Sequence, residues 1–284
     1  MLGDFRRSNR REVILPKRAE NLLNDFQEKI VFEDDKKYDL VYILKESDDN
    51  PDLIMSLRSI EKYCTFRKIW VVGYKPSWLQ NVEYIPTSQD GNKWDNSCTN
   101  WLAACKNKNI SEDFILMNDD FFALQPIYNW KTNLNIALGQ FDAEAKKYKN
   151  TKFSKWQGGF VYGAELLDEL GCKSRLNYEA HTPIMINKKK YLEMMKIPAI
   201  KEYMKTKKVL HKRSIYKNLY PDSEVGSPRI IRDVKMRLHC DLLSLWLMDS
   251  WLSVFDDVVT NNKRFPKVNY FLNKMFPNKS MFEK

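Results

Sequence analysis

The segment 113–124 is the feature that most constrains how this chain of 284 residues can fold. Phe114 to Met117 form a continuous apolar run without charge, and polar or acidic residues flank the run on both sides. Such a run predicts a short strand buried on both faces, as in a parallel sheet. Asn118, Asp119 and Asp120 follow at once, so three oxygen-bearing side chains come directly after a buried strand.

The position of these acids suggests a ligand site. Strands of open parallel sheets present their functional groups at their carboxyl ends. Neighbouring carboxylates repel each other unless a cation, a proton or a donor neutralises them, and Mg²⁺ or Mn²⁺ binds one or two carboxylates together with phosphate oxygens and water. Asp119 and Asp120 are therefore candidates for a metal and diphosphate site. A solvated turn explains the same string, because Asn and Asp also favour turns.

Strand and helix patterns alternate before this segment. Apolar and β-branched runs predict strands, and apolar residues at helical spacing predict helices. In chain order these elements are strand 38–44, helix 52–63, strand 67–73, strand 82–85, helix 95–105 and strand 114–117. This alternation predicts a mostly parallel sheet with helices on both faces.

The chain is expected to form one large domain in three parts. Residues 1–37 contain a basic arm and a helix, 38–128 form an α/β half, and 129–284 form a second half that ends in helices. In the second half, glycines around Phe160-Val-Tyr162 favour a strand, and the apolar run 235–255 favours a core helix or a pair of helices.

The amino-acid composition limits the kinds of binding partner and the cellular compartment that we expect for this protein. Lys and Arg exceed Asp and Glu by 47 − 37 = 10, which favours an anionic partner such as a phosphorylated small molecule, a nucleic acid or an acidic membrane surface. There is neither an apolar run long enough to span a membrane nor an apolar core for a signal peptide at the N-terminus, so a soluble cytoplasmic protein is expected. The five scattered cysteines are expected to be reduced.

A few isolated residues could serve a site near the acids. Lys93 precedes the second helix and Asn96 and Asn100 lie one turn apart on it, so all three can project to one side of the sheet. They could hold a leaving diphosphate, although an ordinary exposed helix start has the same pattern.

Arg58 and His181 are two further candidates for the site, and each also has a purely structural explanation. Arg58 lies in an apolar helix face and needs an anion, either a substrate phosphate or Glu61. His181 lies in an irregular polar segment where an acid, a base or a ligand is useful, whereas a lone histidine is commonly structural.

Several segments, in order and in spacing, resemble the conserved blocks of the Stealth proteins. The matching segments are Tyr38-Asp-Leu-Val-Tyr42, Ser56–Lys62, Arg67–Gly73, Pro76–Leu79, Phe114–Phe122, His181-Thr-Pro183 and Phe276–Glu283. The resemblance implies a glycosyltransferase-A-like fold, with a mostly parallel sheet flanked by helices and a helical C-terminal elaboration. It also implies the transfer of a sugar or a sugar phosphate from a nucleotide-sugar donor. After Val41-Tyr42 this chain continues with Ile-Leu-Lys-Glu-Ser, where the family has Thr-Trp-Val-Asp-Gly.

The resemblance also assigns roles to residues. The family's Asp-x-Asp metal motif corresponds to Asn118, Asp119 and Asp120 in this chain. The implied cofactor is Mn²⁺ or Mg²⁺, and the principal ligand is Asp120. Arg58, Lys93 and Asn100 become candidates for the donor phosphates, and His181 becomes a candidate on the acceptor side.

Three functions remain open from the sequence. The first is a metal-dependent glycosyltransferase; the chain is also similar to phage-type glycosyltransferase-like proteins, for which modified bases in DNA are the implied acceptors. The second is a Stealth-type transferase that moves a sugar 1-phosphate to a capsular or other glycan. The third is a non-catalytic nucleic-acid-binding protein that keeps a transferase-like fold.

Overall fold

The computed structural model describes residues 37–127, 129–206, 208–222, 226–231, 235–236, 251–254 and 272–284, the two short stretches 235–236 and 251–254 by their backbone alone. Apart from residue 37, the expected N-terminal arm and helix lie outside the described residues. In the part of the chain that the structure describes, no helix is both long enough and apolar enough to cross a membrane.

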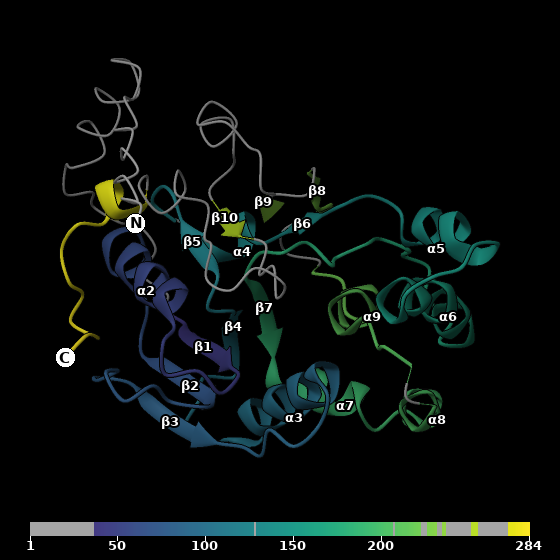
Figure 1. Ribbon diagram of the computed structural model, residues 1–284. Helices are drawn as coiled ribbons and strands as arrows, with labels where there is room; N and C mark the ends of the chain where they lie inside the picture. Colours follow the sequence, from purple (N-terminus) through teal and green to yellow (C-terminus); the bar gives the residue numbers. More distant parts are fainter. Residues whose placement is uncertain are drawn as a thin grey trace, which may run out of the picture.

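A five-stranded sheet forms the centre of the molecule (Figure 1). Its strands lie in the order β3-β2-β1-β4-β7, with β1 to β4 parallel and β7 antiparallel to β4. Their bounds are β1 Asp39–Leu44, β2 Ile69–Gly73, β3 Glu83–Pro86, β4 Asp113–Met117 and β7 Ile184–Asn187. The alternation expected for residues 38–117 is therefore confirmed, and one strand from the second half of the chain completes the sheet.

Both faces of the sheet are covered. Successive side chains of a strand point to opposite faces, so Leu40 and Tyr42 of β1 enter one core while Val41 enters the other. Helix α2 (Pro51–Tyr63) covers the first face, and helices α3 (Lys93–Lys106) and α7 (Lys188–Met194) cover the second. The residues of β1, β2 and β4 are nearly all buried, as in the interior of a parallel sheet, whereas the edge strand β3 is partly exposed.

A helical layer extends the second face (Figure 1). It contains α5 (Phe141–Lys149), α6 (Lys155–Glu169), α8 (Pro198–Lys205) and α9 (Lys212–Leu219). The strand expected at 160–162 is wrong, because these residues lie inside α6. A capping box between Ser154 and Gln157 starts that helix, and Gly159 lets it pass close to the chain before α9.

The remaining described strands are short. β5 (Phe121–Ala123) pairs antiparallel with β10 (Trp251–Val254), which pairs in parallel with β9 (Lys235–Met236). β6 (Ile136–Ala137) pairs with β8 (Arg229–Ile230), and the short helix α4 (Trp130–Asn133) precedes β6. The helices expected over 235–255 are thus wrong at both ends of that range, and residues 237–250 lie outside the described part.

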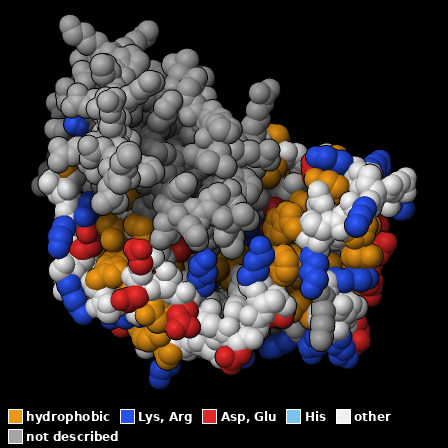
Figure 2. Space-filling model, in the orientation of Figure 1, with side chains coloured by type: hydrophobic (Ala, Val, Ile, Leu, Met, Phe, Trp, Pro, Cys, Tyr) orange, Lys and Arg blue, Asp and Glu red, His pale blue; other side chains and the backbone are white. Residues whose placement is uncertain are grey.

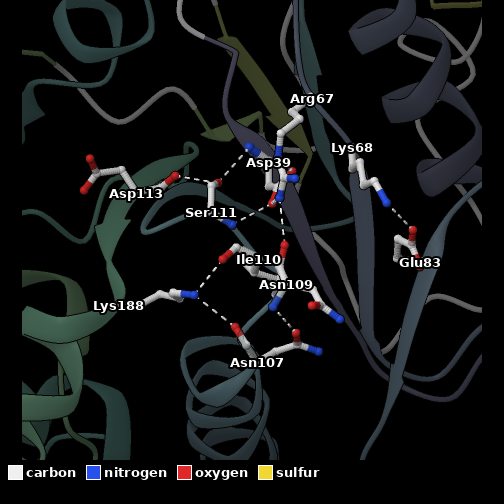
Figure 3. Close-up of polar contacts among 10 residues, drawn as sticks. All are labelled: Asp39, Arg67, Lys68, Glu83, Asn107, Asn109, Ile110, Ser111, Asp113 and Lys188. Atoms are coloured by element: carbon white, nitrogen blue, oxygen red, sulfur yellow. Dashed lines mark hydrogen bonds and ion pairs between the residues drawn. The ribbon is translucent and has the colours of Figure 1, made fainter.

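A polar cluster closes the amino end of the sheet (Figure 3). Asp39 is fully buried there, accepts from the Ser111 amide at 2.7 Å and forms a bidentate ion pair with Arg67. Lys188 donates to the carbonyls of Asn107 and Ile110 at 3.0 and 2.6 Å, which ties the loop before β4 to α7. These side chains satisfy one another and fix the amino ends of β1 and β4.

Candidate active site

A pocket of 250 Å³ lies at the carboxyl ends of β1 and β4. The strand order reverses between these two strands, and such a switch point is where open α/β sheets bind their ligands. Ile43 of β1, Leu116 of β4 and Asn118 line the sheet side of the pocket. The other walls come from the first turns of α3 and α9, from Trp156 of α6 and from residues 179–181 before β7.

Asp120 and His181 form the central contact of the site. Asp120 follows β4 and is 7% exposed, and its Oδ2 lies 2.7 Å from His181 Nε2. The ring of Phe121 packs edge-on against the imidazole, with 4.9 Å between centroids. This contact joins the acids after β4 to the segment before β7, as the antiparallel addition of β7 beside β4 requires.

Asp119 has a different partner. The side chain of Asn50, which caps α2, donates to Asp119 Oδ2 at 2.8 Å. Burial and the neighbouring charge of Asp120 together raise the pKa of Asp119 to about 7, although the Asn50 hydrogen bond acts to lower it. Asp119 therefore carries less than its full negative charge near neutral pH unless a cation joins it.

A second polar group of the site escaped sequence analysis. Arg213 of α9 donates to the carbonyls of Ala180 and Thr182, the residues on either side of His181. Glu179 accepts from the amide and the hydroxyl of Ser214, both at 3.0 Å, and its Oε2 lies 3.6 Å from His211 Nδ1. These side chains fix the segment that carries His181.

The electrostatics of this group follow from burial and pairing. Burial alone would raise the pKa of Glu179, but His211, Arg213 and the Ser214 amide outweigh it and lower that pKa to about 2. Burial also lowers the pKa of Arg213 to about 10, against the attraction of Glu179 and Asp120. Both side chains remain charged at neutral pH, so Glu179 and Arg213 largely offset each other.

Of the other predicted site residues, the structure brings Lys93 and Asn118 to this place beside His181 and has Asn96, Asn100 and Arg58 engaged elsewhere. Lys93, Asn118 and His181 all line the pocket. Asn96 instead accepts from the Gly91 amide and donates to Gln89 O, while Asn100 accepts from Thr87 Oγ1. In the structure both amides hold the loop between β3 and α3, and the predicted substrate contacts of Asn96 and Asn100 stay predictions.

The structure places Arg58 away from this pocket, on the face of α2 that meets the C-terminal segment. Its guanidinium is engaged on α2 by Glu283, at 2.6 and 2.8 Å, and by Phe276 O at 3.2 Å. The anion that it needs is therefore neither a substrate phosphate nor Glu61, which accepts from the Met281 amide. Three of the segments that resemble Stealth blocks, 56–62, 76–79 and 276–283, meet here, since Leu79 also forms a β-bridge with Glu283.

The donor set at the acids can hold a divalent ion, although it is small. Among the described residues, no group of three or more His, Cys, Asp or Glu side chains is close enough to hold a metal ion. Mg²⁺ and Mn²⁺ need only one or two protein ligands when phosphate and water complete the shell. Adjacent ligands of an octahedral ion lie about 3 Å apart for bonds near 2.1 Å. Asp120 Oδ2 and His181 Nε2, 2.7 Å apart, meet that spacing with a small shift.

The strand order, the acids that follow β4 and the pocket beside them define an α/β fold of the glycosyltransferase-A type. The chain is similar to the structure of the galactosyltransferase LgtC in complex with donor and acceptor sugar analogues. The identity is 12%, the TM-score is 0.51, and the match covers 87% of this chain and 98% of LgtC.

Two further structures match less well. The bifunctional glycosyltransferase WbbM matches with 14% identity and a TM-score of 0.39, over 67% of this chain and 38% of its own. The glycosyltransferase GlyE of Streptococcus pneumoniae TIGR4, in its apo form, matches with 10% identity and a TM-score of 0.35, over 70% and 46% of the two chains. At such identities the likeness to LgtC establishes the fold, and the other two add no argument.

No family model matches the chain, and no curated protein matches it in sequence. The resemblance to the Stealth blocks therefore stays a prediction from the sequence.

Proposed function

We propose that this protein is a metal-dependent glycosyltransferase that takes its sugar from a nucleotide-sugar donor. The observation that carries the proposal is the contact of Asp120 with His181 at the switch point of a glycosyltransferase-A fold. The Asp120 carboxylate is a suitable ligand for Mn²⁺ or Mg²⁺, the imidazole favours Mn²⁺ over the harder Mg²⁺, and an adjacent pocket is available for the sugar.

Each residue of the site then has a defined task. Asp120 and His181 would hold the ion, and Asp119, placed by Asn50, would add negative charge beside it. When bound, such an ion supplies a Lewis acid that stabilises the charge of a leaving nucleoside diphosphate. Arg213 keeps the His181 segment in place through the carbonyls of Ala180 and Thr182, and Lys93 adds positive charge at the pocket.

The test is metal-dependent turnover of nucleotide-sugars. Asp120→Asn and His181→Asn should each abolish turnover and weaken Mn²⁺ binding in calorimetry. Asp168→Asn, a change of an exposed acid on α6, should leave both unchanged. Wild-type turnover in the two site variants would reject the assignment.

The acceptor is the next question for the same enzyme. The net charge of +10 supports an anionic acceptor, and DNA with modified bases fits it. A capsular or other glycan that receives a sugar 1-phosphate is the alternative from the Stealth resemblance. Mass spectrometry of the product separates the two, because a transferred sugar and a transferred sugar phosphate differ in added mass.

The non-catalytic alternative rests on the same net charge. A protein that only binds nucleic acid would show affinity for DNA that falls steeply with salt and no turnover with any nucleotide-sugar. Its binding would also be unaffected by Asp120→Asn.

A further inference from the structure

The pocket at the switch point contains more positive charge than the described residues neutralise. Lys93, Lys212 and Arg213 all line it, and Glu179 is the one acid among the described residues on its wall. Glu179 already meets Arg213, His211 and the Ser214 amide, and Arg213 also lies near Asp120. The positive charges of Lys93 and Lys212 are left over. Figure 2 shows Lys and Arg side chains gathered around the middle of this face, where the surface is hollowed.

Lys212 is the unusual member of this set. It is only 9% exposed, yet its side chain lines the pocket, and the contact of its Nζ is with the ring of Trp101, at 5.5 Å from the centroid. Among the described residues no carboxylate or carbonyl oxygen accepts a hydrogen bond from this ammonium group. The stem of Lys212 is buried, whereas its Nζ is not among the fully buried polar atoms that lack a partner, so the ammonium group faces the pocket. Partial loss of water around this charge, without an anion in its place, is unfavourable.

Its place in the fold adds to this cost. Lys212 and Arg213 are the first two residues of α9, and the first turn of that helix has no acidic residue. A helix N-terminus carries a partial positive charge and favours anions, so two cations there are electrostatically unfavourable. Lys93 and Trp94, the first residues of α3, line the same pocket. Two helix N-termini and two unneutralised lysines thus meet in one place.

The rest of the pocket suits a sugar ring. Trp94, Trp101 and Trp156 line it together with aliphatic side chains from the sheet, and indole rings pack on the apolar C–H faces of pyranoses. The volume of 250 Å³ corresponds to about eight waters of liquid, a space of the size of a monosaccharide.

We infer that this pocket binds a sugar that itself carries a carboxylate or phosphate group, with Lys212 as the residue that selects the charge and Lys93 as its second cation. The inference rests on the proposed function for the identity of the ligand as a sugar, and it adds a substrate class to it. The charged group is distinct from the diphosphate of the donor. It can belong to the transferred sugar or to the acceptor sugar.

Direct binding tests the inference without any need for turnover. Glucuronate and glucose 6-phosphate should bind at least about tenfold more tightly than glucose in calorimetry, as a charge-assisted contact predicts. Lys212→Met should remove that preference, whereas Lys212→Arg should keep it. Lys217→Met is the matched control, because it removes another buried lysine of α9 that lines a different pocket, and it should keep the preference. Unfolding curves of all three variants establish that they fold.

Turnover then assigns the charged sugar to one substrate. A preference for a nucleoside-diphosphate glucuronate over the corresponding glucose donor, lost in Lys212→Met, places it on the donor. The same loss with an anionic acceptor and a neutral donor places it on the acceptor. Either result supports the inference.

Two outcomes would overturn it. The first is that the wild-type protein binds glucose as tightly as glucuronate and glucose 6-phosphate. The second is that Lys212→Met weakens binding of a nucleoside diphosphate alone while the charged sugar gives no gain, since the lysine would then serve the diphosphate. Preference for charged sugars without turnover of any nucleotide-sugar would support the pocket assignment and reject the proposed function instead. Turnover with neutral sugars that is unchanged in Lys212→Met would support the proposed function and reject the assignment of the pocket to a charged sugar.

Discussion

Gly159 is the residue of α6 that lies against the chain just before α9. A Cβ built on it would lie 2.7 Å from His211 Nε2 and 2.9 Å from Val209 O. Because the second atom is backbone, Gly159→Ala should separate the two segments and cost about 1–3 kcal/mol of unfolding free energy. Urea denaturation of the purified variant measures this loss.

The adjacent glycine provides the control. A Cβ on Gly158 would lie 2.8 Å from the ring of Phe153, a half-buried side chain that can shift. The gain in helix propensity from Gly to Ala, about 1 kcal/mol, offsets that shift, so Gly158→Ala should be nearly neutral. Equal losses for the two variants would show that the approach of α6 to Val209 is not tight.

Arg213 is expected to act on the metal through His181. Arg213→Lys keeps the charge but loses the two separate guanidinium nitrogens that donate to Ala180 O and Thr182 O, on either side of His181. Removal of such an outer support typically lowers metal affinity by about tenfold or more. Mn²⁺ titration calorimetry measures the change, with Arg229→Lys, at an exposed position, as the control. Unchanged Mn²⁺ affinity in Arg213→Lys would contradict this role.

The residues of the site differ in how far the sequence reveals them. Asp119 and Asp120 follow a buried apolar run, so a local pattern is enough to single them out. His181 is separated from Asp120 by 61 positions, and the sequence reveals it only as a histidine in an irregular polar segment and through the resemblance of that segment to a family block. Glu179, Lys212 and Arg213 have no local signal, because they reach the pocket only through the addition of β7 to the sheet and the packing of α9.

At the scale of elements, the C-terminal segment 276–284 is held on α2 by one nearly buried ion pair. The side chains of Arg58 and Glu283 are 13% and 6% exposed. Burial alone would raise the pKa of Glu283, but hydrogen bonds from Arg58 and Ser280 outweigh it, so the pKa lies below its ordinary value. The stability from this pair is therefore present above the unfolded pKa near 4.5 and is lost as the pH falls through the folded pKa.

Glu283→Gln should then destabilise the protein at pH 7 by about 3 kcal/mol, because it leaves the guanidinium without its charge partner. The difference from wild type should shrink as the pH is lowered below about 4, where the wild-type carboxylate also becomes neutral. Urea denaturation at both pH values measures it. Glu83→Gln, which breaks the exposed pair with Lys68, should cost less than about 1 kcal/mol. A loss in Glu283→Gln that is the same at both pH values would contradict the argument.

The predicted strands and helices are correct where apolar residues recur at a clear strand or helix period. They are wrong where glycines, as around 160–162, or a dense apolar run, as in 235–255, obscure that period. Strands β1 to β4 and helices α2 and α3 have unbroken patterns of the expected period. The glycines at 158, 159 and 163 lie inside α6, where the lack of a side chain allows close contact with Phe153, Val209 and Phe141. These contacts cannot be read from the local sequence, in which the glycines favoured a strand. The capping box of Ser154 and Gln157 was the available signal for a helix.

The whole molecule depends on contacts between the two halves of the chain. The core on the second face of the sheet combines Val41, Trp70 and Phe114 with residues of α6, β7 and α9. β7 also occupies the edge of the sheet beside β4. We therefore expect one cooperative unfolding transition, and we do not expect the first half to be stable alone.

A fragment of residues 1–128 tests this expectation. It retains β1 to β4 with α2 and α3 but loses the helices α5 to α9 from the second face of the sheet, and β4 gains an unpaired edge. Burial of apolar side chains is the main stabilising contribution in a domain, so the loss of these helices and of β7 should leave the fragment without a cooperative urea transition. Near-ultraviolet circular dichroism during the titration measures this, with the full chain as the reference. A sigmoidal transition in the fragment would show that the α/β half folds independently and that the rest of the chain is an addition to a complete domain.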